Sequence, residues 1–374
     1  AKAMQNVSAR RVLIKALLIF LAANLLFPVF SSSPGKGAEP KASPSLYNFV
    51  FPGRQRLPYG DQPDLAYNLS LFDLDAMFAS HIIAAPKAED EYRVVLLGDS
   101  SVWGFLLEPQ DTLSAYLNAA GLSLAGRQVT FYNLGYPTMS VTKDLLLLEH
   151  ALAYQPDLII WLVTLESLPR DKQLSSPIVQ HNPVPVRTLI ETYALDLDPA
   201  DPALENPSFW QRTLVGQRRP LADFLRLQMY GVMWAATGID QYYPPSYDPP
   251  QSDLEADDSF HGLLPPTLQA SDLALDVLQA GVQMAGEVPV LFVNEPIYIS
   301  QGQNSNIRYN FFYPRWAYDQ YRQVLLETCQ QKDWDCLDAW DLVSLGEYTN
   351  SAIHLTPAGE KLLADQISQV TFKK

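Results

Sequence analysis

The stretch RVVLLGDSSVWG, residues 93–104, decides the fold of this chain. Its first five residues form a short and mostly apolar run, and Gly98 and Asp99 then supply a turn. A brief apolar run bounded by turn residues is typical of a strand buried in a parallel sheet. Strands predicted at residues 128–135, 156–164, 288–296 and 335–337 alternate with helices predicted near 111–120, 141–154, 271–286, 314–329 and from Pro357 onward. We therefore expect a flavodoxin-like, three-layer α/β/α sandwich with a parallel sheet.

Two segments of the expected domain, residues 46–374, stand outside this alternation. Residues 46–90 form a preamble, and residues 166–285, rich in Pro, Tyr and acidic residues, form an irregular and partly helical insertion that we expect to cap the site. Within the insertion, residues 220–238 carry Leu, Met and Trp at helical spacing. We interpret this stripe as core packing, with contact to a membrane surface as the alternative.

The amino-terminal part of the chain predicts a membrane anchor. Residues 12–30 are almost wholly apolar and just long enough to cross a bilayer, and Arg10 and Arg11 precede them. The positive flank predicts that residues 1–11 are a cytoplasmic tail and that the body is extracytoplasmic. A cleaved signal peptide is the alternative, but we favour a retained single-pass anchor. Residues 31–45, rich in Ser, Pro and Gly, predict a flexible linker.

Charge and cysteine content exclude several classes of function. With a net charge of -15 and no basic block, the chain lacks the clustered Lys and Arg that neutralise a nucleic-acid backbone. Its two cysteines, Cys329 and Cys336, form no CxxC pair, and its five histidines are scattered, so we expect no metal and no cofactor. In an exported chain the two cysteines either form a disulfide or remain separate buried thiols.

Ser100 is the first candidate site residue. It follows a predicted strand directly, and in open α/β sheets ligands bind at the carboxyl ends of the strands. Backbone N–H groups at the start of a following helix can hold a developing oxyanion at such a place. On its own, however, a Gly-Asp-Ser triplet is also an ordinary turn.

Three blocks together resemble the SGNH/GDSL hydrolases over most of residues 91–168 and 286–374. They are GDSSVWG (98–104), NLGYPTMS (133–140) and IHLTPAGEKLLA (353–364). The resemblance implies that Ser100 is the nucleophile and His354 the general base. It also implies that the backbone N–H groups of Ser100 and Gly135 form the oxyanion hole. Neutral imidazole near pH 7 suits the base, because a serine hydroxyl needs its proton removed before it attacks.

The chain departs from that family in two places. The third block lacks its Asn, because Leu165 stands near that position, and a lost oxyanion donor costs about 2.7–4 kcal/mol. Substitutes that we consider are Thr164, Asn294 and Asn304. The acid three residues before the histidine is also missing, and Ser351 stands there. Candidates for orienting His354 are Asn350, Ser351, Glu347, Asp338 and Asp341, unless the site is a dyad.

These features suggest three functions. The first is a membrane-anchored serine esterase or deacylase acting on O-acyl, mainly acetyl, esters of cell-envelope glycans or lipids. The second is an O-acyltransferase that works with an integral-membrane acyltransferase partner, and it would pass the acyl group to a glycan instead of releasing free acid. The third is a non-catalytic subunit of a membrane complex, for which a Ser100→Ala variant would behave like the wild type.

Overall fold

The computed structural model describes residues 8–30, 46–51, 59–61, 72–204, 208–239 and 243–372. The predicted linker, residues 31–45, lies outside the described residues, as do residues 1–7 of the predicted cytoplasmic tail.

The strands are β1 (Glu91–Leu97), β2 (Ser123–Leu124), β3 (Arg127–Asn133), β4 (Leu158–Val163), β5 (Val290–Asn294) and β6 (Asp335–Asp338). The helices used below are α1 (Ala9–Phe30), α2 (Leu46–Val50), α3 (Leu74–Ala79), α4 (Ser100–Trp103), α5 (Leu113–Ala119), α6 (Val141–Ala151), α7 (Pro177–His181), α8 (Pro183–Tyr193), α9 (Phe209–Arg212), α10 (Arg218–Thr237), α11 (Leu275–Ala285), α12 (Arg315–Lys332) and α13 (Pro357–Phe372).

Among the described residues the sheet has six strands, in the order β2-β3-β1-β4-β5-β6. β1 lies near its centre and pairs in parallel with β3 and β4, so that Val94 stands opposite both Phe131 and Leu158. All residues of β4 are buried, as expected for a strand covered on both faces. The one departure from a parallel sheet is the two-residue edge strand β2, which pairs antiparallel with β3 and is too short to show a periodic pattern.

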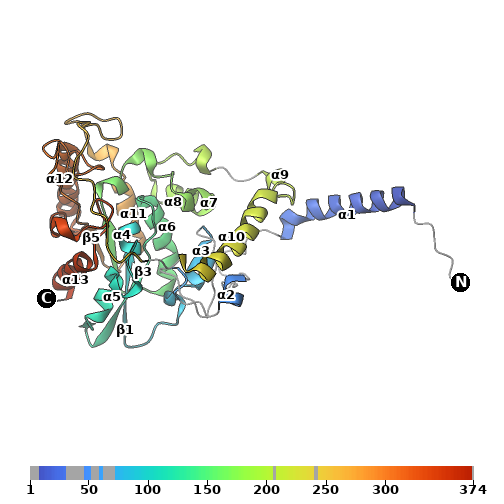
Figure 1. The fold of residues 1–374 in the computed structure, drawn as a ribbon, viewed down its shortest axis with the longest axis horizontal. Helices are drawn as coiled ribbons and strands as arrows, with labels where there is room; N and C mark the ends of the chain where they lie inside the picture. The colour runs from blue at the N-terminus through green and yellow to red at the C-terminus, as the bar shows by residue number, and fades with distance from the viewer. Residues whose placement is uncertain are drawn as a thin grey trace.

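Helices cover both faces of this sheet (Figure 1). Val95 and Leu97 of β1 pack into a core shared with α6, α11 and α12. Val94 and Leu96 of the same strand pack into a second core shared with α5 and α13. Successive residues of a strand point to opposite faces, which is why β1 contributes to both cores. The predicted three-layer α/β/α sandwich is confirmed.

The helix after residue 111 begins differently from our expectation. The helix predicted near residues 111–120 runs over Leu113–Ala119, and its cap is Thr112, whose side chain accepts a hydrogen bond from the backbone N–H of Ala115. Asp111 instead belongs to the preceding turn, Pro109–Asp111, and accepts a hydrogen bond from the Tyr116 hydroxyl. At the other end of the chain Pro357 is the first residue of α13, as predicted, because proline has no N–H to leave unpaired there.

Cys329 and Cys336 form a disulfide. Their Cα atoms are 6.3 Å apart, and the bond joins α12 to β6. Of the two possibilities left open by the sequence, the structure therefore has the bonded one.

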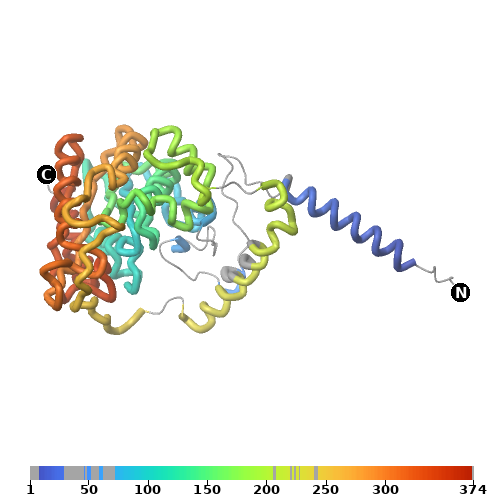
Figure 2. The backbone as a smooth tube through the Cα atoms, turned by 90° about the horizontal axis from the view of Figure 1, so that it is seen from above, coloured from blue at the N-terminus to red at the C-terminus, as the bar shows by residue number. Residues whose placement is uncertain are grey.

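The helices of the expected insertion belong to two groups. α7 and α8 contact α6 on one face of the sheet, and α11 packs there as an ordinary layer helix. α9 and α10, by contrast, lie between α1 and the α/β body, as Figures 1 and 2 both show. The expectation that the apolar stripe of residues 220–238 packs in a core is wrong for Leu225, Met229 and Met233, whose side chains are exposed.

In the described part of the chain, one helix is long and apolar enough to cross a membrane. It is α1, over Ala9–Pro28, and 11% of its most apolar stretch is buried against the rest of the chain. A core helix of that length would be largely covered, so the exposure of α1 fits the expected span better than a place in a soluble core.

Candidate active site

The turn after β1 places Ser100 at the carboxyl edge of the sheet. Asp99 caps α4, because its Oδ1 accepts a hydrogen bond from the Ser101 backbone N–H at 2.8 Å. Ser100 is therefore the first residue of that helix. Gly104 ends the helix with φ 88°, a left-handed conformation that favours glycine. This single turn of helix fixes the position of Ser100 just beyond the carboxyl end of β1.

His354 is far from Ser100 in the sequence, but the two side chains are in contact. The Oγ of Ser100 and the Nε2 of His354 are 2.7 Å apart. His354 lies in the loop before α13, and the backbone N–H of Thr349 donates to its carbonyl oxygen at 2.8 Å. A bridge between Tyr348 and Leu355 closes the same loop. These backbone contacts fix the histidine within hydrogen-bond reach of the serine.

Asn350 is the one residue of the five candidates considered that contacts the imidazole. Its Oδ1 lies 3.2 Å from Nδ1 of His354. An acceptor at that position keeps the proton on Nδ1 and leaves Nε2 free to accept the serine proton. The site is therefore a Ser–His–Asn chain of hydrogen bonds in which the third member carries no charge.

The other four candidates are held elsewhere or stay exposed. Ser351 Oγ accepts a hydrogen bond from the Ile353 backbone N–H, and Glu347 accepts one from the Thr356 hydroxyl. Asp338 pairs with Arg322 and accepts a hydrogen bond from Asn294, while Asp341 is exposed. None of these carboxylates reaches His354.

Burial favours the neutral form of the His354 imidazole. The surroundings of His354 exclude water and lower its pKa below the usual value, while the negative charge of Asp99 offsets part of that shift. Desolvation disfavours the charged imidazolium, so the neutral form that can accept a proton dominates near pH 7. Glu295 and Glu360 lie on the same side of the site, and burial raises the pKa of each well above its usual value.

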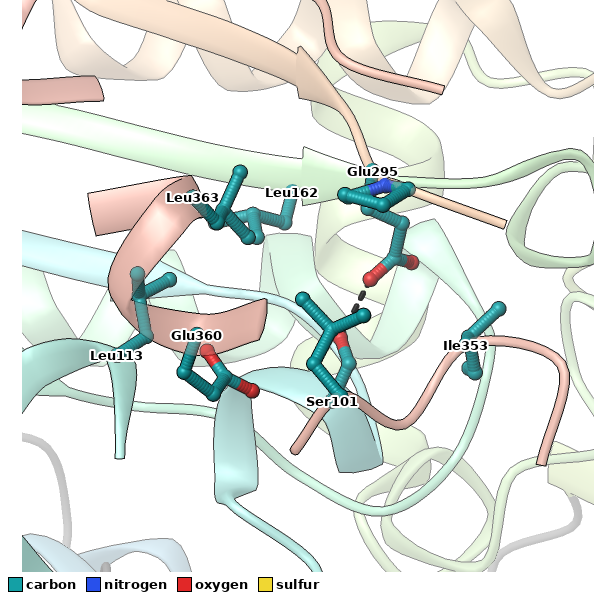
Figure 3. Close-up of a pocket in the computed structure, with 9 residues that line it drawn as sticks. Ser101, Leu113, Leu162, Glu295, Ile353, Glu360 and Leu363 are labelled. Atoms are coloured by element: carbon teal, nitrogen blue, oxygen red, sulfur yellow. Dashed lines mark hydrogen bonds between the residues drawn. The ribbon is translucent and has the colours of Figure 1, made fainter. Parts of the chain in front are cut away.

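Figure 3 shows these two carboxyl groups around a small cavity beneath the nucleophile turn. The hydroxyl of Ser101, the neighbour of Ser100, donates a hydrogen bond to Glu295 there. The cavity has a volume of about 10 Å³ and is also lined by the apolar side chains of Leu113 and Leu162. About one water molecule needs that much room, so this cavity is no place for an acyl chain. The hydrogen bond between Ser101 and Glu295 beside it holds the turn that carries Ser100.

The expected oxyanion hole is only partly available. Gly135 lies directly against α4, because a Cβ atom there would be 2.4 Å from the Trp103 backbone nitrogen. Its N–H group, however, donates to the Asn133 side-chain oxygen at 2.9 Å. Ser100 is the first residue of α4, and the first N–H groups of a helix have no partner within it.

The substitutes considered for the missing Asn are all occupied. Leu165 is buried in the core, and the hydroxyl of Thr164 bonds to that of Tyr313 at 2.9 Å. The side-chain nitrogen of Asn294 donates to Asp338 at 2.7 Å, and that of Asn304 donates to the Leu254 carbonyl oxygen. None of the three side chains is available as an oxyanion donor.

A buried lysine contacts the backbone of the loops that form the site, and the sequence analysis did not identify it. Lys143, in the first turn of α6, is fully buried. Its Nζ donates to the Gly98 carbonyl oxygen at 2.7 Å and to the Tyr136 carbonyl oxygen at 3.2 Å, and it pairs with Asp144. It therefore ties together the loop that carries Ser100 and the loop that carries Gly135. The available signal was a Lys-Asp pair at the start of an otherwise apolar helix.

The remaining histidines lie apart from this pair. His81 is buried and structural, since Nε2 contacts the Asn133 carbonyl oxygen at 2.7 Å and Nδ1 accepts from the Ile83 N–H. His261, for which the sequence indicated no partner, contacts Glu166 and Asp171. Among the described residues, no three His, Cys, Asp or Glu side chains gather as metal ligands would.

Comparison with known proteins adds likeness of fold. No family model matches the chain, and no curated protein matches it. It is similar to a member of the lipolytic protein G-D-S-L family from Veillonella parvula, with 10% identity, a TM-score of 0.34, and 75% of this chain and 98% of that chain covered. It is also similar to the lipase/acylhydrolase from Enterococcus faecalis, with 12% identity, a TM-score of 0.35, and 74% and 93% covered. A carbohydrate acetylesterase family member from Sinorhizobium meliloti shows 12% identity, a TM-score of 0.31, and 74% and 98% covered.

The fold class itself rests on the sheet order and the two helical layers. Together with the site, these define a three-layer α/β protein with a serine–histidine pair at the carboxyl edge of its sheet. Such a pair is the minimum that nucleophilic acyl transfer needs.

Proposed function

We propose that the protein is a membrane-anchored, extracytoplasmic serine esterase that removes O-acyl groups, mainly acetyl, from glycans or lipids of the cell envelope. The observation that carries this proposal is the 2.7 Å contact between Ser100 Oγ and His354 Nε2, with Nδ1 of the same ring held by Asn350. A structural serine–histidine contact needs no such third partner, whereas a base needs its ring oriented.

The reaction would run in two steps. Ser100 Oγ attacks the ester carbonyl carbon while His354 Nε2 takes the hydroxyl proton. The tetrahedral intermediate then collapses, and the alcohol leaves with the proton that His354 returns. Water next attacks the acyl-serine, again losing a proton to His354, and the carboxylic acid departs as Ser100 regains its hydrogen.

The oxyanion would be stabilised by few direct donors. The Ser100 N–H at the start of α4 is the principal one, because the Gly135 N–H is bound to Asn133. The positive charge of buried Lys143 lies behind the same turn, on the Gly98 carbonyl oxygen. Because Lys143 also pairs with buried Asp144, the two charges compensate each other, and the contribution of the lysine is to hold the Gly98 carbonyl oxygen and with it the turn that carries Ser100.

An exposed aromatic ring beside the base supports an ester of small or carbohydrate type. Phe105 is 43% exposed, and its ring centroid lies 5.1 Å from that of His354. An apolar ring at the mouth of the site offers a surface to an acyl group or to the apolar face of a sugar.

The test begins with a fluorophosphonate probe on the full-length protein in detergent or nanodiscs. We expect labelling of the wild type and its loss in Ser100→Ala and in His354→Ala. Ser123→Ala and His181→Ala are matched controls, since both residues are exposed and distant in sequence from the pair. No labelling of folded wild type, or labelling that survives in Ser100→Ala, would reject the proposed nucleophile.

The reaction type is tested next with acetyl and butyryl esters. We expect free acid to be released, faster from acetyl than from butyryl esters. If labelling is intact but acyl groups pass to an added glycan with little free acid, the protein is a transferase. If neither product forms, the non-catalytic interpretation is correct.

A further inference from the structure

Helices α9 and α10 carry an apolar face that the described part of the chain leaves uncovered. Leu225 and Met229 are 63% exposed and Met233 is 57% exposed, and their spacing of four residues puts them on one side of α10. Trp210 of α9 is 68% exposed. Single exposed apolar residues are ordinary, but a continuous row of them marks a surface that contacts something.

The other side of α10 is already occupied. Gln228 and Ala235 are buried, and the side-chain oxygen of Gln228 accepts a hydrogen bond from the Leu46 backbone N–H at 2.8 Å. α2 therefore packs against the small and polar side of α10. This contact fixes which side of the helix faces outward.

The connection with α1 indicates what the outward face meets. The backbone N–H of Val215, between α9 and α10, donates to the side-chain oxygen of Asn24 at 2.8 Å, and Asn24 is buried. Asn24 precedes Phe30, the end of α1, by six residues, which corresponds to about 9 Å along the helix. If α1 crosses a bilayer, the turn between α9 and α10 lies at the depth where headgroups give way to acyl chains. An amide at that depth is costly unless it is hydrogen-bonded, as this one is.

The positive charge of residues 209–237 also favours contact with a lipid surface. Residues 209–237 contain four arginines, Arg212, Arg218, Arg219 and Arg226, and one acid, Asp223, although the whole chain has a net charge of -15. A helix with Leu, Met and Trp on one face and arginines beside them is the pattern of a helix lying in a membrane interface, where the cations meet anionic headgroups.

We propose that α9 and α10 lie in the interface of the bilayer that α1 crosses, with Trp210, Leu225, Met229 and Met233 toward the acyl chains. This second contact would hold the α/β body at a fixed height above the membrane, which a single anchor and linker would not do. The proposal depends on α1 being the membrane span but not on the chemistry of Ser100.

The experiment uses the full-length chain in nanodiscs of phosphatidylcholine and phosphatidylglycerol. Single cysteines replace Met229, Leu18 of α1 or Leu362 of α13, and a thiol-reactive NBD dye labels each without reductant, because the two native cysteines are in a disulfide. Leu362 is the matched control, because it is an exposed apolar residue of α13, and α13 lies on the side of the body away from α1 (Figure 1). Emission is then quenched either by nitroxide on lipid acyl chains or by iodide in the water.

We expect the dye at position 229 to emit at shorter wavelength and to be quenched by lipid nitroxide, as at position 18, while the dye at 362 is quenched by iodide. Iodide quenching at 229 like that at 362 would overturn the proposal. Protection from both quenchers would overturn it too, since protein then covers the face. Iodide quenching at position 18 would show that the anchor itself is wrong. Equal lipid quenching at 229 without phosphatidylglycerol would overturn the role of the arginines.

Discussion

The side-chain oxygen of Asn350 lies 3.2 Å from Nδ1 of His354, where a carboxylate would place a negative charge. The amide orients the ring and selects its tautomer. It does not neutralise the imidazolium that forms when His354 takes the proton of Ser100. In the Ser-His-Asp triad the same change, Asp to Asn, lowers turnover by about 10⁴. If Ser100 and His354 act as proposed, we therefore expect slow turnover from a fully assembled site.

Asn350→Asp is expected to raise the turnover of an acetyl ester. A carboxylate at 3.2 Å would stabilise the imidazolium, and we expect a gain of at least about tenfold, bounded by the factor of about 10⁴ seen for the reverse change. Asn350→Ala is the matched control and should be slower than the wild type, because Nδ1 then loses its partner. Steady-state kcat measures both. If Asn350→Asp is no faster than the wild type, the missing charge does not limit the reaction.

The pH profile of the wild type should reflect a buried base. Burial lowers the pKa of His354 below its usual value of 6.5. Only neutral imidazole accepts the serine proton, so activity is full above this pKa and is lost as the pH falls through it. The acidic limb of kcat/KM should therefore have its midpoint below 6.5, and in Asn350→Asp the midpoint should move upward. A wild-type midpoint above 6.5 would contradict the burial of His354 or its role as base.

Much of the fold could be predicted because buried parallel strands are short apolar runs bounded by turn residues, as at residues 94–97 and 158–163. The pairing of Ser100 with His354 was implied by the resemblance of three sequence blocks to the SGNH/GDSL hydrolases. The disulfide could not be decided, since spacing along the chain does not give the distance between Cα atoms.

Other parts of the site depend on side-chain partners that a single sequence does not specify. A lysine such as Lys143 is common on a solvent-exposed helix, and the sequence alone does not show that this one is buried. The capture of the Gly135 N–H by Asn133 is a local contact between neighbours in a loop. The apolar stripe of α10 has the same periodicity whether it faces a core or a bilayer, and for this reason Met229 was misassigned.

Removing the buried ammonium of Lys143 should destabilise the body strongly. Lys143→Met leaves Asp144 buried without its charge partner and the Gly98 carbonyl oxygen without its donor, and breaking such a pair costs about 3–5 kcal/mol. Asp144→Asn added to Lys143→Met should recover part of the loss, because asparagine can still accept the Trp161 hydrogen bond without carrying charge.

Urea unfolding of the detergent-solubilised chain measures these differences. Lys361→Met is the matched control, since Lys361 pairs with Asp365 on the surface and should change the free energy of unfolding by no more than about 1 kcal/mol. Equal effects of Lys143→Met and Lys361→Met would contradict the buried pair.

Gly135→Ala tests whether the close contact between the Gly135 loop and α4 positions Ser100. A Cβ at Gly135 would lie 2.4 Å from the Trp103 backbone nitrogen and 2.7 Å from the Val102 carbonyl carbon, so that either the loop or α4 must move. Overpacking of this kind costs about 1–3 kcal/mol, and here the displaced backbone carries the nucleophile. We expect slower fluorophosphonate labelling of Ser100 in addition to the loss of stability. Gly346→Ala is the control, because no atom lies within 4 Å of its Cβ position, and it should change neither quantity. If Gly135→Ala loses stability but keeps the wild-type labelling rate, the contact supports the fold and not the position of the serine. The alignment of Ser100 with His354 would then depend on α4 and the loop before α13 alone.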